Sequence, residues 1–153
     1  MKPVLFALIS VVALAACGSS EQRPGIALRG EVAQALPADW SFTQEHREIA
    51  VQVRAPYFLP HSVTIWCAEI NGELYVGARE PDSKKWPGWV DRNPNVRLKI
   101  ADQVYEVKLT PVEDAARFAA IQLAYRAKYE LPAPAPDAEP VPYRYWAVGS
   151  RSM

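Results

Sequence analysis

The feature that most constrains this chain is the segment 62–79, in which two runs of alternating residues are joined by Asn71-Gly72. Asn-Gly tolerates positive φ at both central positions of a type I′ turn, the favoured two-residue connection of a β-hairpin. One face of the hairpin is then apolar (Ile65, Cys67, Leu74, Val76, Ala78), and the other is mixed (Thr64, Trp66, Tyr75, Gly77, Arg79). The register places Trp66 opposite Gly77, so we expect the indole to cover the glycine.

A second hairpin is predicted at residues 95–111, with its turn at Ala101-Asp102. Apolar and charged residues alternate on both sides of this turn, as in strands with one buried and one solvated face. The two-residue turn sets Leu98 opposite Tyr105 on the buried face. Pattern and register agree, which supports the hairpin.

The rest of the chain contributes two strands, one helix and two connections. Alternation predicts strands at 48–53 and 143–149, and apolar residues at steps of three and four predict a helix at 113–129. Residues 80–94 have a proline near each end and a Pro-Gly inside, which predicts a long irregular loop with one helical turn. Residues 131–142 hold five prolines and predict a stiff extended connection. Six strands and one helix predict a mainly β (α+β) domain, a small closed or half-open barrel with the helix packed outside.

The composition excludes some classes of protein. Seventeen Lys and Arg balance seventeen Asp and Glu, without a basic stripe between aromatics, so nothing indicates nucleic-acid binding. Five Trp, seven Tyr and fourteen Pro are typical of a β-rich domain. His46 and His61 lie in expected loops without partners at metal-ligand spacing, so no metal site is predicted. Cys67 alternates with Ile65 on the apolar face, which predicts a buried side chain rather than a nucleophile.

The beginning of the chain resembles a bacterial lipoprotein signal peptide. Lys2 precedes a short uncharged apolar stretch that ends in Leu-Ala-Ala-Cys at residues 14–17. The resemblance implies cleavage before Cys17 and acylation of that residue, which would attach the protein to a membrane. An uncleaved anchor or a fortuitous cysteine is the alternative.

Three parts are therefore expected along the chain. Residues 1–16 are the leader, residues 17–43 hold the lipidated cysteine, a polar tether and a connecting loop with a short helix around 32–36, and residues 44–153 form the domain. About 135 residues remain after cleavage, enough for one domain with a core of its own. The expected location is the cell envelope. It is the outer membrane, facing the periplasm, if the source has two membranes, because no Asp follows Cys17.

Several short strings, taken in order, resemble a bacterial family of uncharacterised function. They are Glu48-Ile49, Trp66, Asn71-Gly72-Glu73-Leu74-Tyr75-Val76, Lys85-Trp86 and Ala124-Tyr125-Arg126-Ala127-Lys128-Tyr129. That family is similar to the FMN-binding split β-barrels, a superfamily that includes pyridoxamine 5′-phosphate oxidases and deazaflavin (F420)-dependent nitroreductases. The resemblance covers residues 48–149. It implies a six-stranded split β-barrel with one long helix packed outside, and a homodimer.

The resemblance also implies a cofactor site. In split barrels the cofactor phosphate meets basic side chains at the end of the third strand and in the following loop, and the ring lies in a groove between sheet and loop. The matching positions are Arg79, Lys84, Lys85, Trp86 and Asn93, and the hairpin face of Arg79 adds Trp66 and Tyr75. The implied ligand is FMN, F420 or a similar flat anionic molecule, which needs cations and a flat apolar surface. No catalytic residue is assigned.

Two interpretations of function stay open at this stage. In the first, an envelope lipoprotein binds such a ligand and carries out oxidoreductase chemistry. In the second, the barrel is a non-catalytic scaffold or interaction module, Lys84 and Lys85 are solvated loop charges, and Trp86 and Trp89 plug the end of the barrel.

Overall fold

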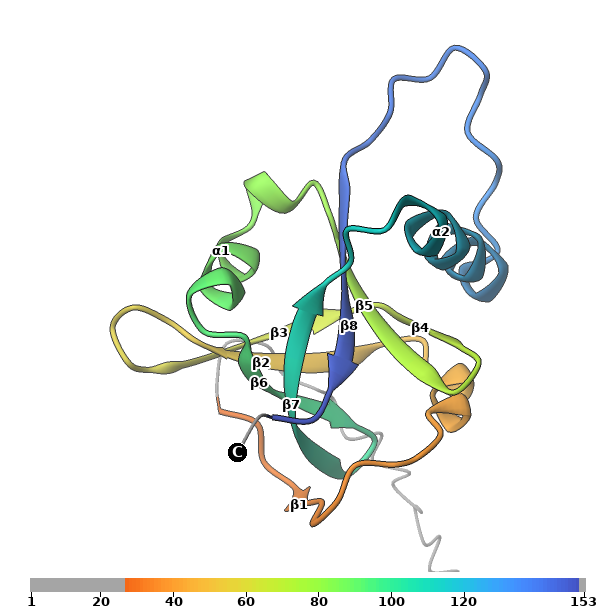
Figure 1. Cartoon of the computed structure of the whole chain (residues 1–153). Helices are drawn as coiled ribbons and strands as arrows, with labels where there is room; N and C mark the ends of the chain where they lie inside the picture. Colours follow the sequence, from red (N-terminus) through yellow and green to blue (C-terminus); the bar gives the residue numbers. More distant parts are fainter. Residues whose placement is uncertain (1–26, 152–153) are drawn as a thin grey trace, which may run out of the picture.

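A computed structural model of the chain describes residues 27–151 (Figure 1). The predictions for the leader and for Cys17 lie outside these residues. The described chain forms one eight-stranded sheet with helices beside it. The strands are β1 (Glu31–Val32), β2 (Ile49–Arg54), β3 (Pro60–Ile65), β4 (Cys67–Ile70), β5 (Glu73–Arg79), β6 (Asn95–Ile100), β7 (Gln103–Pro111) and β8 (Tyr143–Gly149). The α-helices are α1 (Lys85–Arg92) and α2 (Ala115–Tyr129), and 3-10 turns lie at Ser41–Glu45 and Pro81–Ser83.

The sheet closes on itself at one residue. Its strand order is β3-β2-β6-β7-β8-β5-β4, with the short β1 parallel to β7 outside this path. The two outermost strands, β3 and β4, are consecutive in the chain and are separated only by Trp66. Ile65 pairs with Ile49 of β2, whereas Cys67 pairs with Val76 of β5, so the chain changes partners at this point. We call this point the split.

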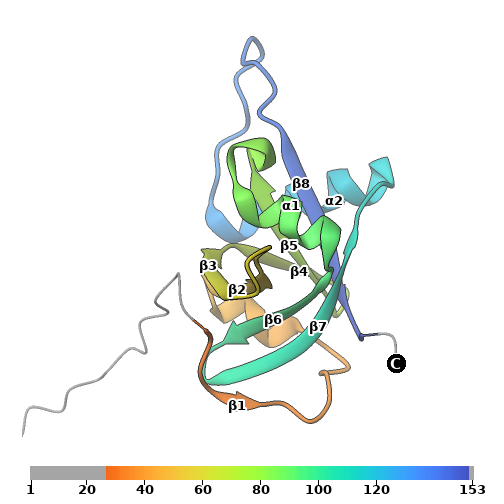
Figure 2. The ribbon, with the colours of Figure 1, turned by 90° about the vertical axis from the view of Figure 1, so that its left-hand side faces the viewer.

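The predicted fold class is confirmed, and the predicted strand count is wrong for two reasons. The expected single strand of residues 62–70 is divided at Trp66, because its two halves pair with different neighbours. The expected short helix around 32–36 is wrong: Glu31–Val32 form β1, which pairs with the beginning of β7, and residues 33–36 are irregular. Figure 2 shows β1 beside that end of β7, away from both α-helices.

Both predicted hairpin registers are confirmed. In the first, Cys67 lies opposite Val76, and the turn residues Asn71 and Gly72 both have positive φ, 52° and 84°. Gly72 supplies the conformation at no steric cost, as a type I′ turn requires. In the second, Leu98 lies opposite Tyr105. Turn chemistry and alternation are local properties, and they were sufficient here.

The expected cover of Gly77 by Trp66 is wrong. Gly77 pairs with Tyr145 of β8, and a Cβ added at Gly77 would lie 2.7 Å from the Tyr145 ring. Trp66 instead stacks on Tyr129 of α2, with ring centroids 4.1 Å apart and an interplanar angle of 9°. The hairpin pattern could not show that β8 lies on the other side of β5 and supplies the covering ring.

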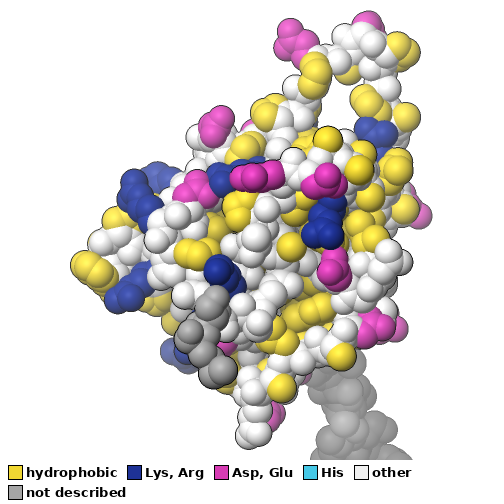
Figure 3. All heavy atoms as spheres, in the orientation of Figure 1, with side chains coloured by type: hydrophobic (Ala, Val, Ile, Leu, Met, Phe, Trp, Pro, Cys, Tyr) yellow, Lys and Arg dark blue, Asp and Glu magenta, His cyan; other side chains and the backbone are white. Residues whose placement is uncertain are grey.

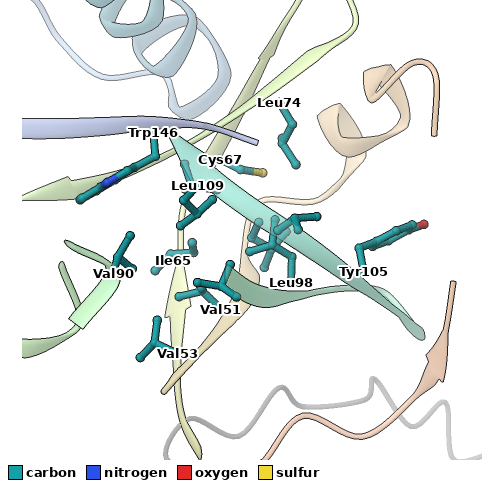
Figure 4. Close-up of a cluster of buried hydrophobic side chains, with 14 of the residues drawn as sticks. Val51, Val53, Ile65, Cys67, Leu74, Val90, Leu98, Tyr105, Leu109 and Trp146 are labelled. Carbon is teal, nitrogen blue, oxygen red and sulfur yellow. The ribbon is translucent and has the colours of Figure 1, made fainter. Parts of the chain in front are cut away.

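The predicted irregular loop at 80–94 is wrong in its extent, because the single helical turn expected inside it is the eight-residue helix α1. Pro87 is the third residue of this helix, where a backbone N–H has no partner within the helix, so proline is tolerated. Trp86, Pro87 and Val90 are buried. The helix closes one end of the barrel, and Figure 4 shows Val90 facing Trp146 there.

Apolar side chains fill the inside of the barrel, and we call this set the barrel core (Figure 4). Its buried members are Trp40, Ile49, Val51, Val53, Ile65, Cys67, Leu74, Val76, Ala78, Trp86, Val90, Val96, Leu98, Ile100, Tyr105, Val107, Leu109 and Trp146. Trp40 comes from the segment expected to be a connecting loop, and its ring meets Tyr105 edge to face at 5.1 Å. The chain before β2 therefore contributes to the core.

The predicted helix is confirmed as α2, which packs on the outside of the sheet. The Asp114 carboxylate caps it by accepting a hydrogen bond from the Arg117 N–H at 2.7 Å. Between α2 and the sheet lies a second buried set, which we call the tyrosine layer: Ala68, Tyr75, Ile121, Tyr125, Tyr129 and Tyr145. Within residues 27–151, neither α-helix combines the length and the hydrophobicity needed to span a bilayer.

Candidate functional site

The candidate site is a cleft of about 900 Å³ beside the split. Several parts of the chain line it: the strand residues around Trp66 and around Gly77, the loop after β5 with the start of α1, the face of α2 from Gln122 to Arg126, the proline segment 131–142 and the start of β8. Small-molecule sites in proteins commonly measure roughly 300–1,000 Å³. The cleft is therefore large enough for a cofactor-sized ligand.

At the split, backbone N–H and C=O groups form hydrogen bonds with tyrosine hydroxyls of α2. The Tyr125 hydroxyl donates to the carbonyl of Trp66 at 2.9 Å. The Tyr129 oxygen accepts from the Cys67 N–H at 3.0 Å, and its proton is within reach of the carbonyls of Arg47 and Cys67 at 2.8 and 2.9 Å. Because buried backbone polar groups need partners, these hydroxyls fasten α2 beside the split.

Burial extends the protonated state of these hydroxyls far into the alkaline range. It raises the pKa of Tyr125 well above its usual value and also raises the pKa of Tyr129, because the phenolate would lose its hydration. A protonated hydroxyl can donate to a carbonyl, whereas a phenolate cannot. The wall of the cleft formed by α2 therefore has a fixed hydrogen-bonding pattern over the physiological range.

The proline segment forms a wall of the cleft that both of its ends hold in place. The Leu131 N–H donates to the carbonyl of Arg126 at 3.0 Å, and the Glu80 N–H donates to the carbonyl of Pro142 at 2.8 Å. Each proline fixes its own φ near −65°, which limits the conformations that the segment can adopt. Figure 1 shows the segment as an arch that rises from the end of α2 and returns into β8.

Four of the seven predicted cofactor residues line the cleft: Trp66, Arg79, Lys84 and Trp86. Tyr75, Lys85 and Asn93 are not among its lining residues. Tyr75 lies under α2, where burial and a 2.5 Å hydrogen bond to Glu73 raise its pKa to about 12. Lys85 is exposed at the start of α1. Asn93 follows the end of α1, and its side chain accepts from the Asn95 N–H at 3.1 Å.

The position of Trp86 also agrees in part with the alternative expectation, in which Trp86 and Trp89 plug the end of the barrel. Trp86 is 5% exposed, and its ring centroid lies 5.1 Å from that of Trp146. Trp86 is thus both a member of the barrel core and part of the cleft wall. Its partner in that expectation, Trp89, is half-buried against the barrel core.

Sequence reasoning missed a cation in the cleft, Arg126. A basic residue near the end of a helix is favourable for the helix dipole, which explains the position without any ligand. Gln122 lies one turn earlier on α2 and lines the cleft too. The spacing of these two residues was visible in the sequence, but their proximity to the split depends on how α2 packs.

The charges in the cleft are mixed, with a small excess of positive charge. Arg79, Lys84 and Arg126 line it, together with the carboxylates of Glu48 and Glu139, so three positive and two negative groups leave a net charge of +1. The Lys84 ammonium donates to the carbonyl of Arg79, which ties the loop after β5 to the strand end. Figure 3 shows a surface on which basic and acidic side chains are interspersed.

The residues present fit a flat anionic cofactor. Arg79 and Arg126 both line the cleft, and a guanidinium group offers a phosphate several donors in a planar fork. The ring of the cofactor can lie against an aromatic surface, since Trp66 remains 40% exposed although it stacks on Tyr129. Tyr143 and Tyr145 add further aromatic surface to the lining.

Other chemistry finds little support among residues 27–151. They contain no group of three or more His, Cys, Asp or Glu side chains that could hold a metal ion. Cys67 is fully buried, and burial raises the pKa of its thiol although Lys128 Nζ lies 3.3 Å from the sulfur. The thiol is therefore a poor nucleophile.

Comparison with solved structures identifies the fold. The chain is similar to a candidate 5-nitroimidazole antibiotic resistance protein from Bacteroides thetaiotaomicron, with 15% identity, 71% of this chain and 75% of the other covered, and a TM-score of 0.52. It is similar to a candidate pyridoxamine 5′-phosphate oxidase from Listeria innocua, with 15% identity, coverage of 71% and 86%, and a TM-score of 0.52. It is also similar to an F420 reductase, with 17% identity, coverage of 76% and 97%, and a TM-score of 0.51.

At these identities the likeness shows the split-barrel fold alone. No curated protein matches the chain. The profile of one family, described as an uncharacterized protein conserved in bacteria (DUF2255), matches residues 42–138, which run from the 3-10 turn before β2 into the proline segment. The chain therefore belongs to the DUF2255 family of bacterial proteins.

Proposed function

We propose that this protein binds FMN, F420 or a similar flat anionic ligand in the cleft and that the bound cofactor supports an oxidoreductase reaction. One observation carries the proposal: Arg79 and Arg126 line the same cleft as the exposed ring of Trp66. The two arginines are 47 positions apart in the sequence. Two structural neighbours, a candidate pyridoxamine 5′-phosphate oxidase and an F420 reductase, support the same ligand class.

The chain's own residues have distinct parts in this proposal. Arg79 and Arg126 bind the phosphate, and Lys84 orients the strand end through the carbonyl of Arg79. Trp66 positions the ring, and the proline segment keeps water from it. When bound, FMN or F420 supplies hydride or electron transfer, which none of these side chains can supply.

The test begins with the visible spectrum of the purified protein and its titration with FMN and F420. We expect Arg79→Ala with Arg126→Ala to weaken binding by at least about tenfold, because a hydrogen bond to a charged group contributes about 1.5–3 kcal/mol. Lys84→Ala tests the orienting contact and should have a smaller effect.

A matched control comes from the residue that the sequence had placed in the site. Lys85→Ala also removes a positive charge, but Lys85 does not line the cleft. The affinity of Lys85→Ala for FMN or F420 should stay within about twofold of that of the original protein. An equal loss in both variants would mean that the ligand responds to general charge rather than to this cleft. A colourless protein that takes up neither cofactor leaves the non-catalytic scaffold as the function.

We also infer that Cys17 is acylated and anchors the protein in the cell envelope, in the outer membrane and facing the periplasm where two membranes exist. The Leu-Ala-Ala-Cys string after a short apolar stretch supports this. The mass of the N-terminal peptide from membrane-extracted protein tests it. The expected peptide begins at a diacylglyceryl-modified Cys17, and Cys17→Ala should abolish both the modification and the membrane association. A homodimer stays a prediction, which sedimentation velocity would check.

A further inference from the structure

The loop between β2 and β3 presents three large apolar side chains to solvent. Tyr57, Phe58 and Leu59 are 56%, 76% and 62% exposed. Figure 1 shows this loop as a projection from the barrel, and the corresponding pole in Figure 3 carries hydrophobic side chains with Lys or Arg side chains on both sides. Large apolar residues scattered singly on a surface are ordinary, but three in succession at a projecting tip indicate a contact.

Phe58, at the apex of the loop, has a backbone conformation that aromatic residues rarely adopt. Phe58 has φ of 63°, in the left-handed region where Gly and Asn are favoured. Its N–H donates to the carbonyl of Ala55 at 2.9 Å, which closes the turn. An aromatic residue at such a position is unfavourable for folding, so its presence points to a role outside the fold.

The chain segment that forms the tip carries basic but no acidic side chains. From Ile49 to Ala68 the chain contains no acidic residue, and the Arg54 guanidinium lies 5.2 Å from the centre of the Phe58 ring. Within residues 27–151 no ion pair involves Arg54. Tyr57 also meets Trp89 of α1 at 6.1 Å between ring centroids. That helix carries the exposed Arg92 and also Asp91, whose carboxylate is paired with Arg144.

We propose that the tip of this loop inserts into the interfacial region of an anionic lipid bilayer, with Arg54 at the level of the headgroups. Tyr and Trp favour the boundary between hydrocarbon and water, Phe and Leu enter the acyl region, and basic residues are attracted to anionic lipid. The inference rests on the proposed envelope location, which would hold the domain close to a membrane. Insertion would then orient the cleft relative to the bilayer.

A second copy of the chain is a weaker candidate for the occupant. Stable protein interfaces bury roughly 1,200–2,000 Å² and depend on complementary surfaces. The tip is a narrow projection of three side chains, which is too small for such an interface by itself but sufficient for shallow insertion between lipids.

The test uses a chain that begins at Gly18, so that Cys17 cannot contribute. All buried residues of the barrel core and the tyrosine layer lie between Trp40 and Trp146, so this chain keeps both sets intact. Co-sedimentation with vesicles of phosphatidylcholine and phosphatidylglycerol should show binding that weakens with added salt, and vesicles of phosphatidylcholine alone should bind less. Phe58→Ser with Leu59→Ser should lower the partition coefficient by at least about tenfold.

Two variants make the result specific. Leu123→Ser changes a residue of α2 that is 66% exposed and should leave binding unchanged. Phe58→Gly removes the ring at a position whose φ glycine prefers, so it should fold at least as stably and still lose binding. Loss of binding in Phe58→Gly with unaltered melting therefore cannot be attributed to unfolding.

Three results would overturn the proposal: no binding to anionic vesicles, an equal loss in Leu123→Ser, or a dimer in solution that Phe58→Gly converts to a monomer. The last result would assign the tip to a contact between two copies. Failure of the envelope location is distinguishable, because it is measured by the mass of the Cys17 peptide and not by vesicle binding.

Discussion

The two faces of the sheet are packed in different ways. The barrel core inside consists mainly of Val, Ile and Leu, whereas four of the six members of the tyrosine layer outside are tyrosines: Tyr75, Tyr125, Tyr129 and Tyr145. Aliphatic packing is non-directional and stabilises the barrel in proportion to the area buried. Tyrosine adds a hydroxyl that must find a partner when buried, so it also determines orientation.

This difference shows how the site is constructed. The barrel core stabilises the sheet, and the hydroxyls of the tyrosine layer position α2 at the split, where the strand ladders leave backbone groups over. The cleft lies where these two systems meet. Substitutions in the barrel core should therefore affect stability most, and substitutions in the tyrosine layer should affect both stability and the cleft.

The largest effect is expected inside the barrel. Leu98→Ala removes a fully buried side chain of β6 and should lower the free energy of unfolding by about 2–5 kcal/mol, through lost burial and a cavity. Urea denaturation followed by Trp fluorescence measures this. Leu123→Ala, at a residue that is 66% exposed, is the control and should change stability by less than about 0.5 kcal/mol.

A crowding substitution tests the contact between the sheet and the tyrosine layer. Gly77→Ala places a Cβ 2.7 Å from the buried Tyr145 ring and should lower the free energy of unfolding by about 1–3 kcal/mol. It should also weaken ligand binding, since Gly77 and Tyr145 both line the cleft. Gly88→Ala is the control in α1, where an added Cβ meets nothing within 4 Å. Equal destabilisation by both substitutions would contradict the close approach.

Removal of one hydroxyl tests the role assigned to the tyrosine layer. Tyr129→Phe keeps the ring but leaves the Cys67 N–H without its acceptor, so it should lower the free energy of unfolding by about 1–3 kcal/mol. Tyr57→Phe removes a hydroxyl from the exposed loop tip and should be within about 0.5 kcal/mol of the original protein. If the two variants are equally stable, the hydroxyl does not hold α2 at the split.

The smallest effect at neutral pH concerns Tyr75 and becomes visible only in alkali. Its pKa is raised to about 12 by burial and by the hydrogen bond to Glu73, whereas a tyrosine in the unfolded chain ionises near pH 10. Above that pH the unfolded state binds fewer protons than the folded state, so stability falls as the pH rises. Tyr75→Phe should make this decline less steep between about pH 10 and 12, as measured by urea denaturation at each pH. If the slope of the decline is the same in Tyr75→Phe, the ionisation of Tyr75 does not contribute to the loss of stability in alkali.

Much of the fold could be predicted from the sequence because its signals are local. Asn71-Gly72 and Ala101-Asp102 determine two registers through turn geometry, and the residues of 113–129 show their helical period directly. The failure at 85–92 is instructive. Pro87 and Gly88 are read as breaks in a helix, yet Pro87 stands in the first turn, where its missing N–H does no harm.

The candidate site was harder to predict than the fold. Arg79 ends β5, and Lys84 and Trp86 follow it closely in sequence. All three were placed in the site by resemblance, and they line the cleft. Tyr75 was placed there because it shares a hairpin face with Arg79, but α2 covers that part of the face. Arg126 was missed because the sequence of a helix does not show which part of the protein lies beside each of its faces.

By itself the sequence determined the hairpins, the helix α2, the buried state of Cys67 and the basic segment after β5, since each depends on neighbours within a few residues. Only the tertiary structure decided that Trp66 separates β3 from β4, that Tyr145 rather than Trp66 covers Gly77, and that Arg126 reaches the cleft. These features depend on which elements pack together at long range. Such packing is set by the closure of the whole barrel, and alternation within one strand does not reveal its second neighbour.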